Sequence, residues 1–128
     1  MTDATDFPDA VALPDAADFA GVVALTVLTT TDSAAKAEEL ARGAVEARLA
    51  ACAQVSAPVT SVFHWRDAVE TTREWQVLFK TVPQRYAELA AHLIAAHDYD
   101  TPEVLATPVV AGAPAYLDWL RQETTPRG

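Results

Sequence analysis

Residues 55–82 read VSAPVTSVFHWRDAVETTREWQVLFKTV, and the expected architecture follows from this segment. It contains two long runs rich in Val, Thr, Phe and Trp, about Val55–Trp65 and Glu70–Val82, whose spacing predicts an antiparallel hairpin. The connecting residues 66–69 include no Gly or Asn, so the turn type is not predicted. Pro58 interrupts the first run, which indicates an edge position or a bulge at that point.

A predicted strand and a predicted helix precede the hairpin. Val22–Thr29 is a near-continuous apolar and β-branched run, which is typical of a strand buried within its sheet. Asp32 then offers an N-cap for a helix that we expect to run to about Ala51. The apolar stripe of this helix is rich in alanine and includes Cys52, so it suits a helix that lies flat on a sheet.

A second predicted helix and a fourth predicted strand follow the hairpin. Pro83 ends the hairpin, and a helical pattern covers about Gln84–His97. After a turn cluster, Glu103–Val110 is expected to be a strand, and Pro108 within it again indicates an edge. Pro114 lies early in a short last helix, where its missing N–H costs least.

The element order is therefore βαββαβ with one additional helix at the C-terminus. Two split βαβ units predict an α+β, ferredoxin-like sandwich, in which helices cover one face of an antiparallel sheet. The central hairpin is longer than such a sandwich needs, and its strands would overrun the sheet and present open edges. Soluble proteins normally cover such edges, so the pattern predicts that copies of the chain associate with one another.

Length and composition limit the classes of function. The 128 residues predict one domain, with an acidic, disordered tail over residues 1–20 and the folded domain over residues 21–128. The formal net charge is −9 and the Lys and Arg residues are scattered, so we expect neither nucleic-acid binding nor attraction to an anionic membrane surface. No apolar run is long enough to span a bilayer.

The single cysteine and the first residues predict the compartment. Cys52 is the only cysteine, so the fold is not expected to depend on a disulfide. The chain begins Met1-Thr2-Asp3 and has no Lys or Arg before Lys36, which does not match the basic start of a secretory signal. We therefore expect a cytoplasmic protein.

Several short motifs lie between about residues 22 and 122. They are Arg48-Leu49-Ala50-Ala51-Cys52, Ser61-Val62-Phe63-His64-Trp65, Glu70, Glu74, Lys80-Thr81, His97-Asp98-Tyr99-Asp100-Thr101-Pro102-Glu103, Gly112, and Tyr116-Leu117 followed by Trp119. Each motif alone is weak, but together they occur in the order and with spacing similar to those of the CutA family of divalent-cation tolerance proteins. The chain therefore resembles that family over about residues 22–122.

The resemblance implies a ferredoxin-like homotrimer held by its long hairpins and similar in architecture to the PII signalling proteins. It also implies association with divalent metal, copper above all, and no obligatory cofactor. Three features depart from the family pattern. Asp98 stands where the family has proline, the turn after Trp65 lacks the usual glycine, and Thr29 stands where some members carry a cysteine that can serve a metal. Threonine is a poor copper ligand, so the metal site is not expected to carry over unchanged.

His97 and Glu103 are the preferred metal-ligand candidates, with Cys52 as a further soft ligand. Imidazole, carboxylate and thiolate all bind transition metals, and His97 is expected at the end of a helix, where the helix dipole favours a cation. The alternative is structural: His97 caps the helix and bonds within the loop, and Cys52 is a small buried hydrophobic residue. The sequence leaves both interpretations open.

A second candidate site is a cleft between subunits, lined by Trp65, Glu70, Lys80, Tyr99 and Trp119. Aromatic walls with few charges are typical of small-ligand sites. Lys80 follows an apolar run, so it points either into the cleft toward an anion or to an edge of the sheet. The alternative is an ion pair between subunits, with the aromatic residues serving as interface anchors.

Three functions are compatible with these candidates. The first is a trimeric protein of metal response or signalling that binds a divalent cation. The second is a PII-like sensor with a small-molecule effector in the cleft, although the chain lacks a Gly-rich phosphate loop. The third, an enzyme that uses His97 and Glu103 as acid and base, is disfavoured because no nucleophile with a base and an orienting group is recognisable. We therefore expect no enzymatic activity.

Overall fold

The computed structural model describes residues 14–127, which form a layer of antiparallel strands and the helices that pack against it. The strands are β1 (Ala24–Thr31), β2 (Cys52–Val55), β3 (Val59–Trp65), β4 (Ala68–Thr81) and β5 (Leu105–Val109). The helices are α1 (Ala34–Glu46), α2 (Tyr86–Ala96) and α3 (Pro114–Glu123), with short 3₁₀ helices η2 (Ala16–Phe19) and η3 (Pro83–Arg85). None of the helices in the described part is long and apolar enough to cross a membrane.

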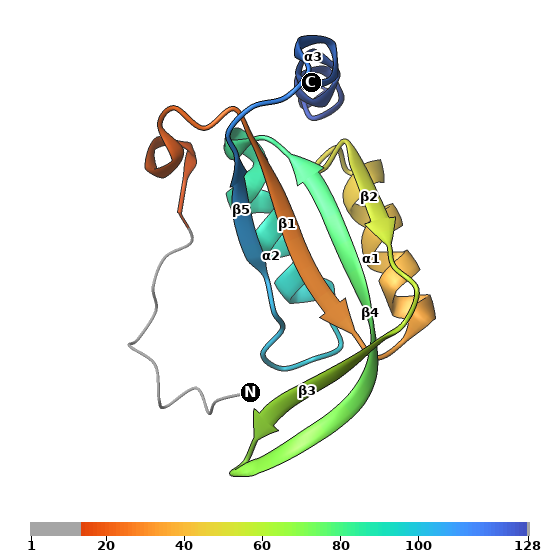
Figure 1. Cartoon of the computed structure of the whole chain (residues 1–128). Coiled ribbons are helices and arrows are strands. Elements are labelled where there is room, and N and C mark those ends of the chain that lie inside the picture. Colours follow the sequence, from red (N-terminus) through yellow and green to blue (C-terminus); the bar gives the residue numbers. More distant parts are fainter. Residues whose placement is uncertain (1–13, 128) are drawn as a thin grey trace.

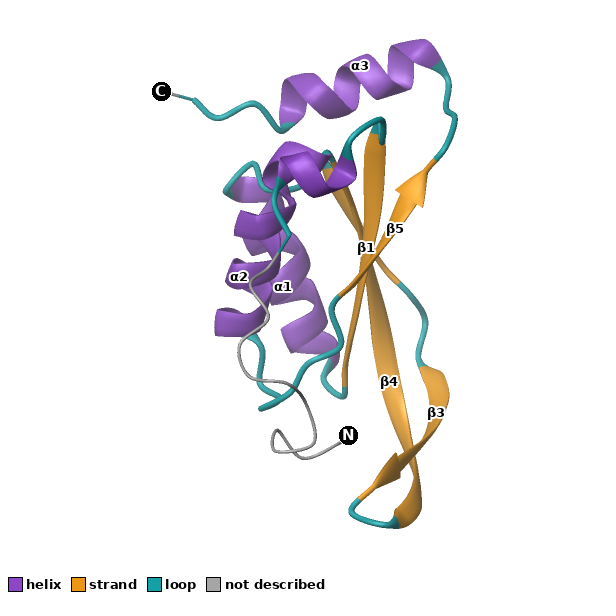
Figure 2. Ribbon diagram, turned by 90° about the vertical axis from the view of Figure 1, so that its left-hand side faces the viewer, coloured by secondary structure: helices purple, strands orange, loops and turns teal. Residues whose placement is uncertain are grey.

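The main sheet has the strand order β2-β4-β1-β5, with every neighbouring pair antiparallel. Figures 1 and 2 show α1 and α2 on the same face of this sheet, and α3 beyond the end of the sheet where β5 finishes. This arrangement confirms the predicted α+β, ferredoxin-like architecture. β5, which contains Pro108, occupies an edge of the sheet as expected.

The hydrophobic core lies between the sheet and the two longer helices. Ala37 and Ala44 are fully buried on α1, where small side chains allow the helix to approach the sheet closely. Phe79 from β4 and Leu93 from α2 are also fully buried. Burying one large apolar side chain stabilises the fold by about 1.5–3 kcal/mol, so this core holds both helices on the sheet.

β4 extends well beyond its neighbour β1. Residues 75–81 pair with β1, whereas residues 68–74 have β3 as their partner in the described chain. β3 and the first half of β4 therefore leave the main sheet as a two-stranded ribbon, residues 59–74, which projects downward in Figure 2. The long predicted hairpin is confirmed, and the ribbon is its protruding part.

The hairpin has two local features that the sequence pattern did not define. The turn is Arg66-Asp67, and both residues have positive φ, 50° and 66°, as a two-residue type I′ turn requires. Pro58 lies in a gap between β2 and β3, so the first predicted strand is two strands. Across this gap the Ser56 N–H donates to the Gln76 carbonyl at 2.8 Å, and the Ser56 Oγ accepts from the Gln76 N–H at 2.9 Å.

The first helix differs from the prediction at both ends. Ser33, not Asp32, is the N-cap, and its Oγ accepts a backbone N–H at 3.1 Å. α1 ends at Glu46, and Arg48 takes a left-handed φ of 60°, which stops the helix without a glycine. Cys52 consequently begins β2 and does not belong to the apolar stripe of the helix, which corrects its sequence-based placement.

The predicted N-terminal tail falls partly outside the described residues. Residues 1–13 lie outside them, whereas residues 14–20 include η2 and pack against the domain. The rings of Phe19 and Tyr86 meet edge-to-face with centroids 5.5 Å apart. The packed unit therefore begins before the predicted boundary at residue 21.

Candidate functional site

A cavity of about 790 Å³ lies where the ribbon leaves the main sheet. Its walls are formed by the ribbon, the end of β1 and the segment between α2 and β5. The lining residues are Thr30, Asp32, Ser61, Val62, Phe63, Trp65, Glu70, Thr71, Thr72, Glu74, Gln76, Tyr99, Asp100, Thr101 and Glu103. In Figure 1 this region is at the lower end of β1, and α3 is at the opposite end of the sheet. Its volume is in the range typical of small-molecule sites.

The alternation of side chains along the ribbon explains the composition of one wall. Successive strand residues point to opposite faces, so Glu70, Thr72 and Glu74, which all line the cavity, share one face of β4. Phe63 is the register partner of Glu70 across the ribbon and lies on the same face. The ribbon therefore presents acidic and aromatic side chains on a single wall.

Glu74 and Tyr99 form a buried polar contact within the cavity. Glu74 is 7% exposed, and its Oε2 accepts the Tyr99 hydroxyl at 2.7 Å. Burial, followed by the bond to the Glu74 carboxylate, raises the pKa of the Tyr99 hydroxyl, so this group stays neutral and keeps its donor proton. Burial, and then the charge of Glu74, also raises the pKa of the Glu103 carboxyl above its ordinary value. The charge of Glu74 therefore acts on two neighbouring groups.

The cavity carries charge of one sign. Five carboxylates line it, and no Lys, Arg or His of the described chain is among its lining residues. The carboxylates come from three segments: the residues after β1, the first half of β4, and the connection between α2 and β5. Acidic walls concentrate counter-ions in a concave site, so the cavity favours cations over anions.

His97 contacts two cavity residues but is itself fully enclosed. Its Nε2–H donates to the Thr30 carbonyl at 2.8 Å, and its Nδ1 accepts from the Tyr99 N–H at 3.0 Å. With both ring nitrogens engaged, the neutral imidazole has no lone pair left for a metal. The Asp98 carboxylate lies 3.2 Å from Nδ1 and accepts the Thr31 hydroxyl. This geometry corresponds to the structural interpretation of His97, which ties the segment carrying Tyr99 to β1.

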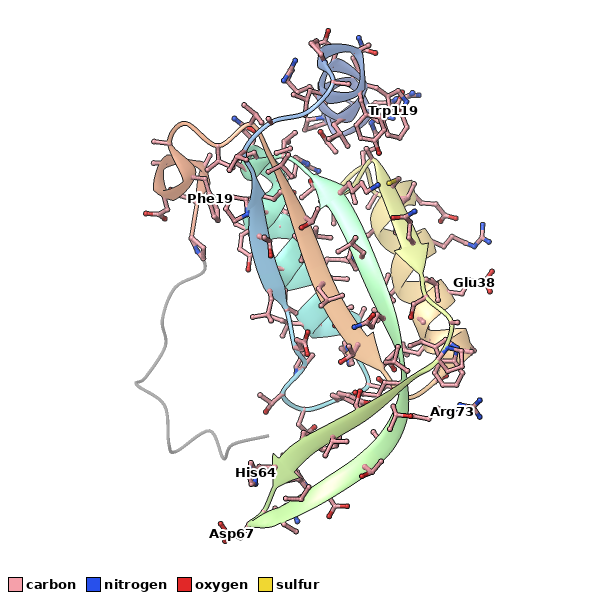
Figure 3. All side chains as sticks on the ribbon, viewed as in Figure 1. Phe19, Glu38, His64, Asp67, Arg73 and Trp119 are labelled. Atoms are coloured by element: carbon pink, nitrogen blue, oxygen red, sulfur yellow. The ribbon has the colours of Figure 1, made fainter. Side chains whose placement is uncertain are left out.

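Other predicted site residues gather near α3, at the far end of β4. Cys52 and Lys80 are register partners on β2 and β4. The Cys52 Sγ lies 3.9 Å from the Tyr116 hydroxyl, and the Lys80 Nζ lies 5.7 Å from the centroid of the same ring. The rings of Tyr116 and Trp119 are 5.5 Å apart on α3, where Figure 3 labels Trp119. Within the described chain Lys80 therefore has an aromatic partner and no carboxylate partner.

The residues predicted for one cleft thus fall into two groups within a single chain. The cavity is lined by Trp65, Glu70, Tyr99 and the metal candidate Glu103. The second group, near α3, consists of Lys80, Cys52 and Trp119. About 33 Å of β4 separates Glu70 from Lys80. The three metal candidates do not converge either: residues 14–127 contain no group of three or more His, Cys, Asp or Glu side chains placed to hold a metal ion.

The residues that the sequence prediction missed at these two places include Asp32, Glu74 and Asp100 in the cavity, and Tyr116 near α3. Two of them carried a usable signal. Glu74 follows Glu70 by an even number of strand residues, which puts both on one face. Tyr116 lies about one helical turn before the predicted tryptophan. The two aspartates lie outside the strands and helices, where periodicity does not fix the direction of a side chain.

Comparisons with known proteins identify the family to which the chain is similar. A family model described as CutA1 divalent ion tolerance protein matches residues 25–123. The divalent-cation tolerance protein CutA of Thermus thermophilus is 38% identical over 98 residues, which cover 77% of this chain and 95% of that protein. The chloroplastic protein CutA of Arabidopsis thaliana is 33% identical over 103 residues, which cover 80% of this chain and 57% of that protein.

Solved structures give the same relationship. CutA from Xylella fastidiosa aligns with a TM-score of 0.78 and 33% identity, covering 80% of this chain and 98% of that one. The divalent cation tolerance protein from Thermus thermophilus aligns with a TM-score of 0.78 and 36% identity, covering 80% of this chain and 99% of that one. Because sequence and fold agree over most of its length, the chain belongs to the CutA1 divalent ion tolerance family.

Proposed function

We propose that this protein is a homotrimer that serves divalent-cation tolerance without catalysing a reaction. The observation that carries the proposal is the ribbon, because within the described part of one chain its two strands pair with each other and with no third strand. An isolated two-stranded ribbon is marginally stable at best in water. Neighbouring copies of the chain supply the packing that the ribbon needs.

The ribbon also exposes apolar surface on the face opposite Phe63 and Glu70. Val62 and Val69 are each 65% exposed, and the strand register puts both on this face. Figure 3 labels His64 and Asp67 at the tip of the ribbon, which projects away from the helices. Soluble proteins cover projecting apolar strands of this kind, which supports burial of the ribbon between copies.

Copper is the metal that the family resemblance favours, but the residues of one chain do not fit a copper site. Both ring nitrogens of His97 are engaged, and Glu103 and Cys52 belong to separate groups. Thr29 offers a hydroxyl oxygen, which suits copper poorly. We therefore propose that divalent metal binds where copies meet, with ligands from more than one copy. The engagement of His97 also argues against the pairing of His97 and Glu103 as acid and base, on which the enzyme hypothesis relied.

Native mass spectrometry of the full chain, alone and titrated with Cu²⁺, tests the assembly and the metal together. We expect a trimer whose metal uptake is lost when the copies separate. Copper binds many surface sites that combine His and carboxylate, so the comparison with separated copies is necessary. A monomeric wild-type chain would overturn the assembly. Uptake by the trimer no tighter than about 1 mM would remove the metal part of the proposal.

A second candidate function, a PII-like sensor that binds a small effector, is favoured by the cavity. Its volume and its aromatic walls, which include Trp65 and Tyr99, match those of small-ligand sites. Its carboxylates disfavour nucleotides and other anions. Thermal unfolding in the presence of small ligands tests this function: we expect stabilisation by cations, and stabilisation by nucleotides would contradict it.

A further inference from the structure

The cavity holds negative charge that has no counter-ion in the described chain. Glu74 is 7% exposed, and its hydrogen bond from the neutral Tyr99 hydroxyl leaves the charge uncompensated. No Lys, Arg or His of residues 14–127 forms an ion pair with Glu74 or Glu103. A buried carboxylate without a positive partner destabilises a fold, because removing charge from water is unfavourable. A cation bound at this place would remove the imbalance.

A bare metal ion fits this lining poorly. Hard divalent ions gather about six or more oxygen ligands around a single point, at roughly 2.0–2.6 Å. Over residues 14–127 no three His, Cys, Asp or Glu side chains converge in that way. The carboxylates are instead spread around a cavity of about 790 Å³. Separated negative charges match a ligand whose positive charges are also separated.

Aromatic side chains form a second part of the cavity lining. Phe63 and Trp65 line the cavity from β3, and Tyr99 lines it from the segment after α2. Aromatic faces attract cations, and they also bury the methylene groups of a ligand. A ligand that contacts both the aromatic and the acidic walls therefore carries cationic groups on an apolar chain.

Building on the proposed sensor role of the cavity, we propose that it binds an aliphatic polyamine, a flexible methylene chain with two or more ammonium groups. One ammonium group lies between Glu74 and Glu103, and the methylene chain packs on Trp65. A second ammonium group reaches Glu70, near the outer part of the ribbon. The Tyr99 hydroxyl orients the Glu74 carboxylate by its hydrogen bond. Such a ligand is recognised by apolar contact as well as by charge, unlike a metal ion.

Isothermal titration calorimetry of the full-length protein with spermidine, a linear triamine, tests this proposal. About 150 mM salt screens unspecific attraction to the net charge of −9. Glu74→Gln removes a charge but keeps an oxygen for the Tyr99 hydroxyl, and we expect about tenfold weaker binding. Trp65→Leu removes an aromatic face, and we expect about threefold weaker binding.

Glu46→Gln is the matched control, because Glu46 is exposed on α1 away from the cavity. The affinity of this variant for spermidine should stay within about twofold of the wild-type affinity.

A competition with Mg²⁺ separates polyamine recognition from simple charge attraction. We expect spermidine to remain bound at an equal concentration of Mg²⁺, and complete displacement would overturn the proposal. No binding of spermidine, or equal losses of affinity in Glu74→Gln and Glu46→Gln, would overturn it as well.

Light scattering on the same samples distinguishes failure of the polyamine site from failure of the proposed trimer. A monomer that binds spermidine with the expected variant pattern supports the polyamine site and overturns the trimer, whereas a trimer without binding overturns the polyamine site alone.

Discussion

Thr29 and Thr81 are fully buried strand residues whose hydroxyl groups have different surroundings. The Thr81 Oγ1 donates to the Leu49 carbonyl at 2.7 Å, whereas the Thr29 Oγ1 has no hydrogen-bond partner among residues 14–127. Leaving a buried hydroxyl unpaired costs about 1–3 kcal/mol, and valine keeps the branched shape without the hydroxyl. We expect Thr29→Val to raise the free energy of unfolding by about 1 kcal/mol and Thr81→Val to lower it by about 1 kcal/mol.

Chemical denaturation at a fixed protein concentration measures both changes, and the two variants control for each other. They make the same chemical substitution at equal burial and differ in the lost hydrogen bond. A loss of stability in Thr29→Val as large as that in Thr81→Val would show that the Thr29 hydroxyl has a partner in the assembled protein.

Glu103 links the acidic cavity to the pH dependence of stability. Burial first, and the charge of Glu74 second, raise the pKa of Glu103 above its ordinary value of 4.5. The folded state therefore holds this proton more tightly than the unfolded state, so the free energy of unfolding falls as the pH rises from 4.5 through the raised pKa. Glu103→Gln removes the ionisable carboxyl, so the free energy of unfolding of the variant does not fall for this reason. We expect the variant to be more stable than the wild type above that interval, by less than about 1 kcal/mol because water partly screens the group.

Thermal unfolding at about pH 4 and about pH 7 tests the role of Glu103. At the lower pH the carboxyl is largely protonated in both states, so the variant and the wild type should unfold at similar temperatures. An equal gain at both pH values would mean that the substitution acts through packing and not through the charge.

The C-terminal end of α3 is contacted by one side chain that is distant in sequence, Arg48. The Arg48 Nε and Nη2 donate to the carbonyls of Thr125 and Gln122 at 2.9 and 2.7 Å, and Nη1 lies 3.5 Å from the Glu123 carboxylate. A cation at this end of a helix satisfies carbonyls that lack intrahelical partners. We expect Arg48→Met, which keeps the aliphatic stem, to lower the free energy of unfolding by about 1–3 kcal/mol and to speed hydrogen exchange in α3.

The matched control for Arg48 is Arg42→Met on the exposed face of α1. Arg42 pairs with Glu38 one helical turn away, and both side chains are about two-thirds exposed. Its loss should change the free energy of unfolding by less than about 0.5 kcal/mol. Unchanged exchange in α3 of the Arg48→Met protein would show that the helix is held by its apolar contacts alone.

The types of the elements were predictable from sequence periodicity, whereas several of their ends were not. Runs of apolar residues identified the strands and the hairpin because burial dictates their spacing. The termination of α1 just before Arg48 and the turn at Arg66-Asp67 rely on left-handed backbone at residues other than glycine, which a sequence pattern does not mark. Tertiary contacts decide such places, as the bonds from the Arg48 guanidinium to α3 illustrate.

The candidate site was predictable only as far as strand alternation reaches. Trp65 and Glu70 were assigned to a cleft, and both line the cavity. Lys80 was assigned to the same cleft, but it lies near α3 at the other end of β4. Alternation indicates the face on which a strand residue lies but not its distance from loops that fold back from other parts of the chain. Such loops bring Asp32 and Asp100 to the cavity.

At the scale of the whole molecule, the two groups of candidate residues lie at opposite ends of one long strand. About 33 Å of β4 separates Glu70 from Lys80, so side chains of one chain cannot join the two groups into one cleft. In the proposed trimer, the ribbon is the element able to bring residues of the two groups together from different copies. The predicted cleft between subunits therefore depends on assembly through the ribbon.

Assembly through the ribbon should make stability depend on protein concentration. When a subunit lacks stability of its own, dissociation and unfolding are coupled, and mass action raises the unfolding temperature with concentration. We expect a rise of about 3 °C for each tenfold increase in concentration. A wild-type unfolding temperature that is constant over about a hundredfold range of concentration would mean that one copy folds without a partner.

Val62→Arg puts a charge on the exposed face of the ribbon, where Val62 is 65% exposed in one chain. We expect this variant to be monomeric by light scattering and to unfold at a lower temperature, because a charge buried at an interface without a partner is unfavourable. Val45→Arg is the matched control: Val45 is 37% exposed on α1, a helix on the covered face of the sheet, and the trimer mass should not change. Dissociation in the control but not in Val62→Arg would move the assembly surface from the ribbon to the helices, because only a residue buried between copies is sensitive to an added charge.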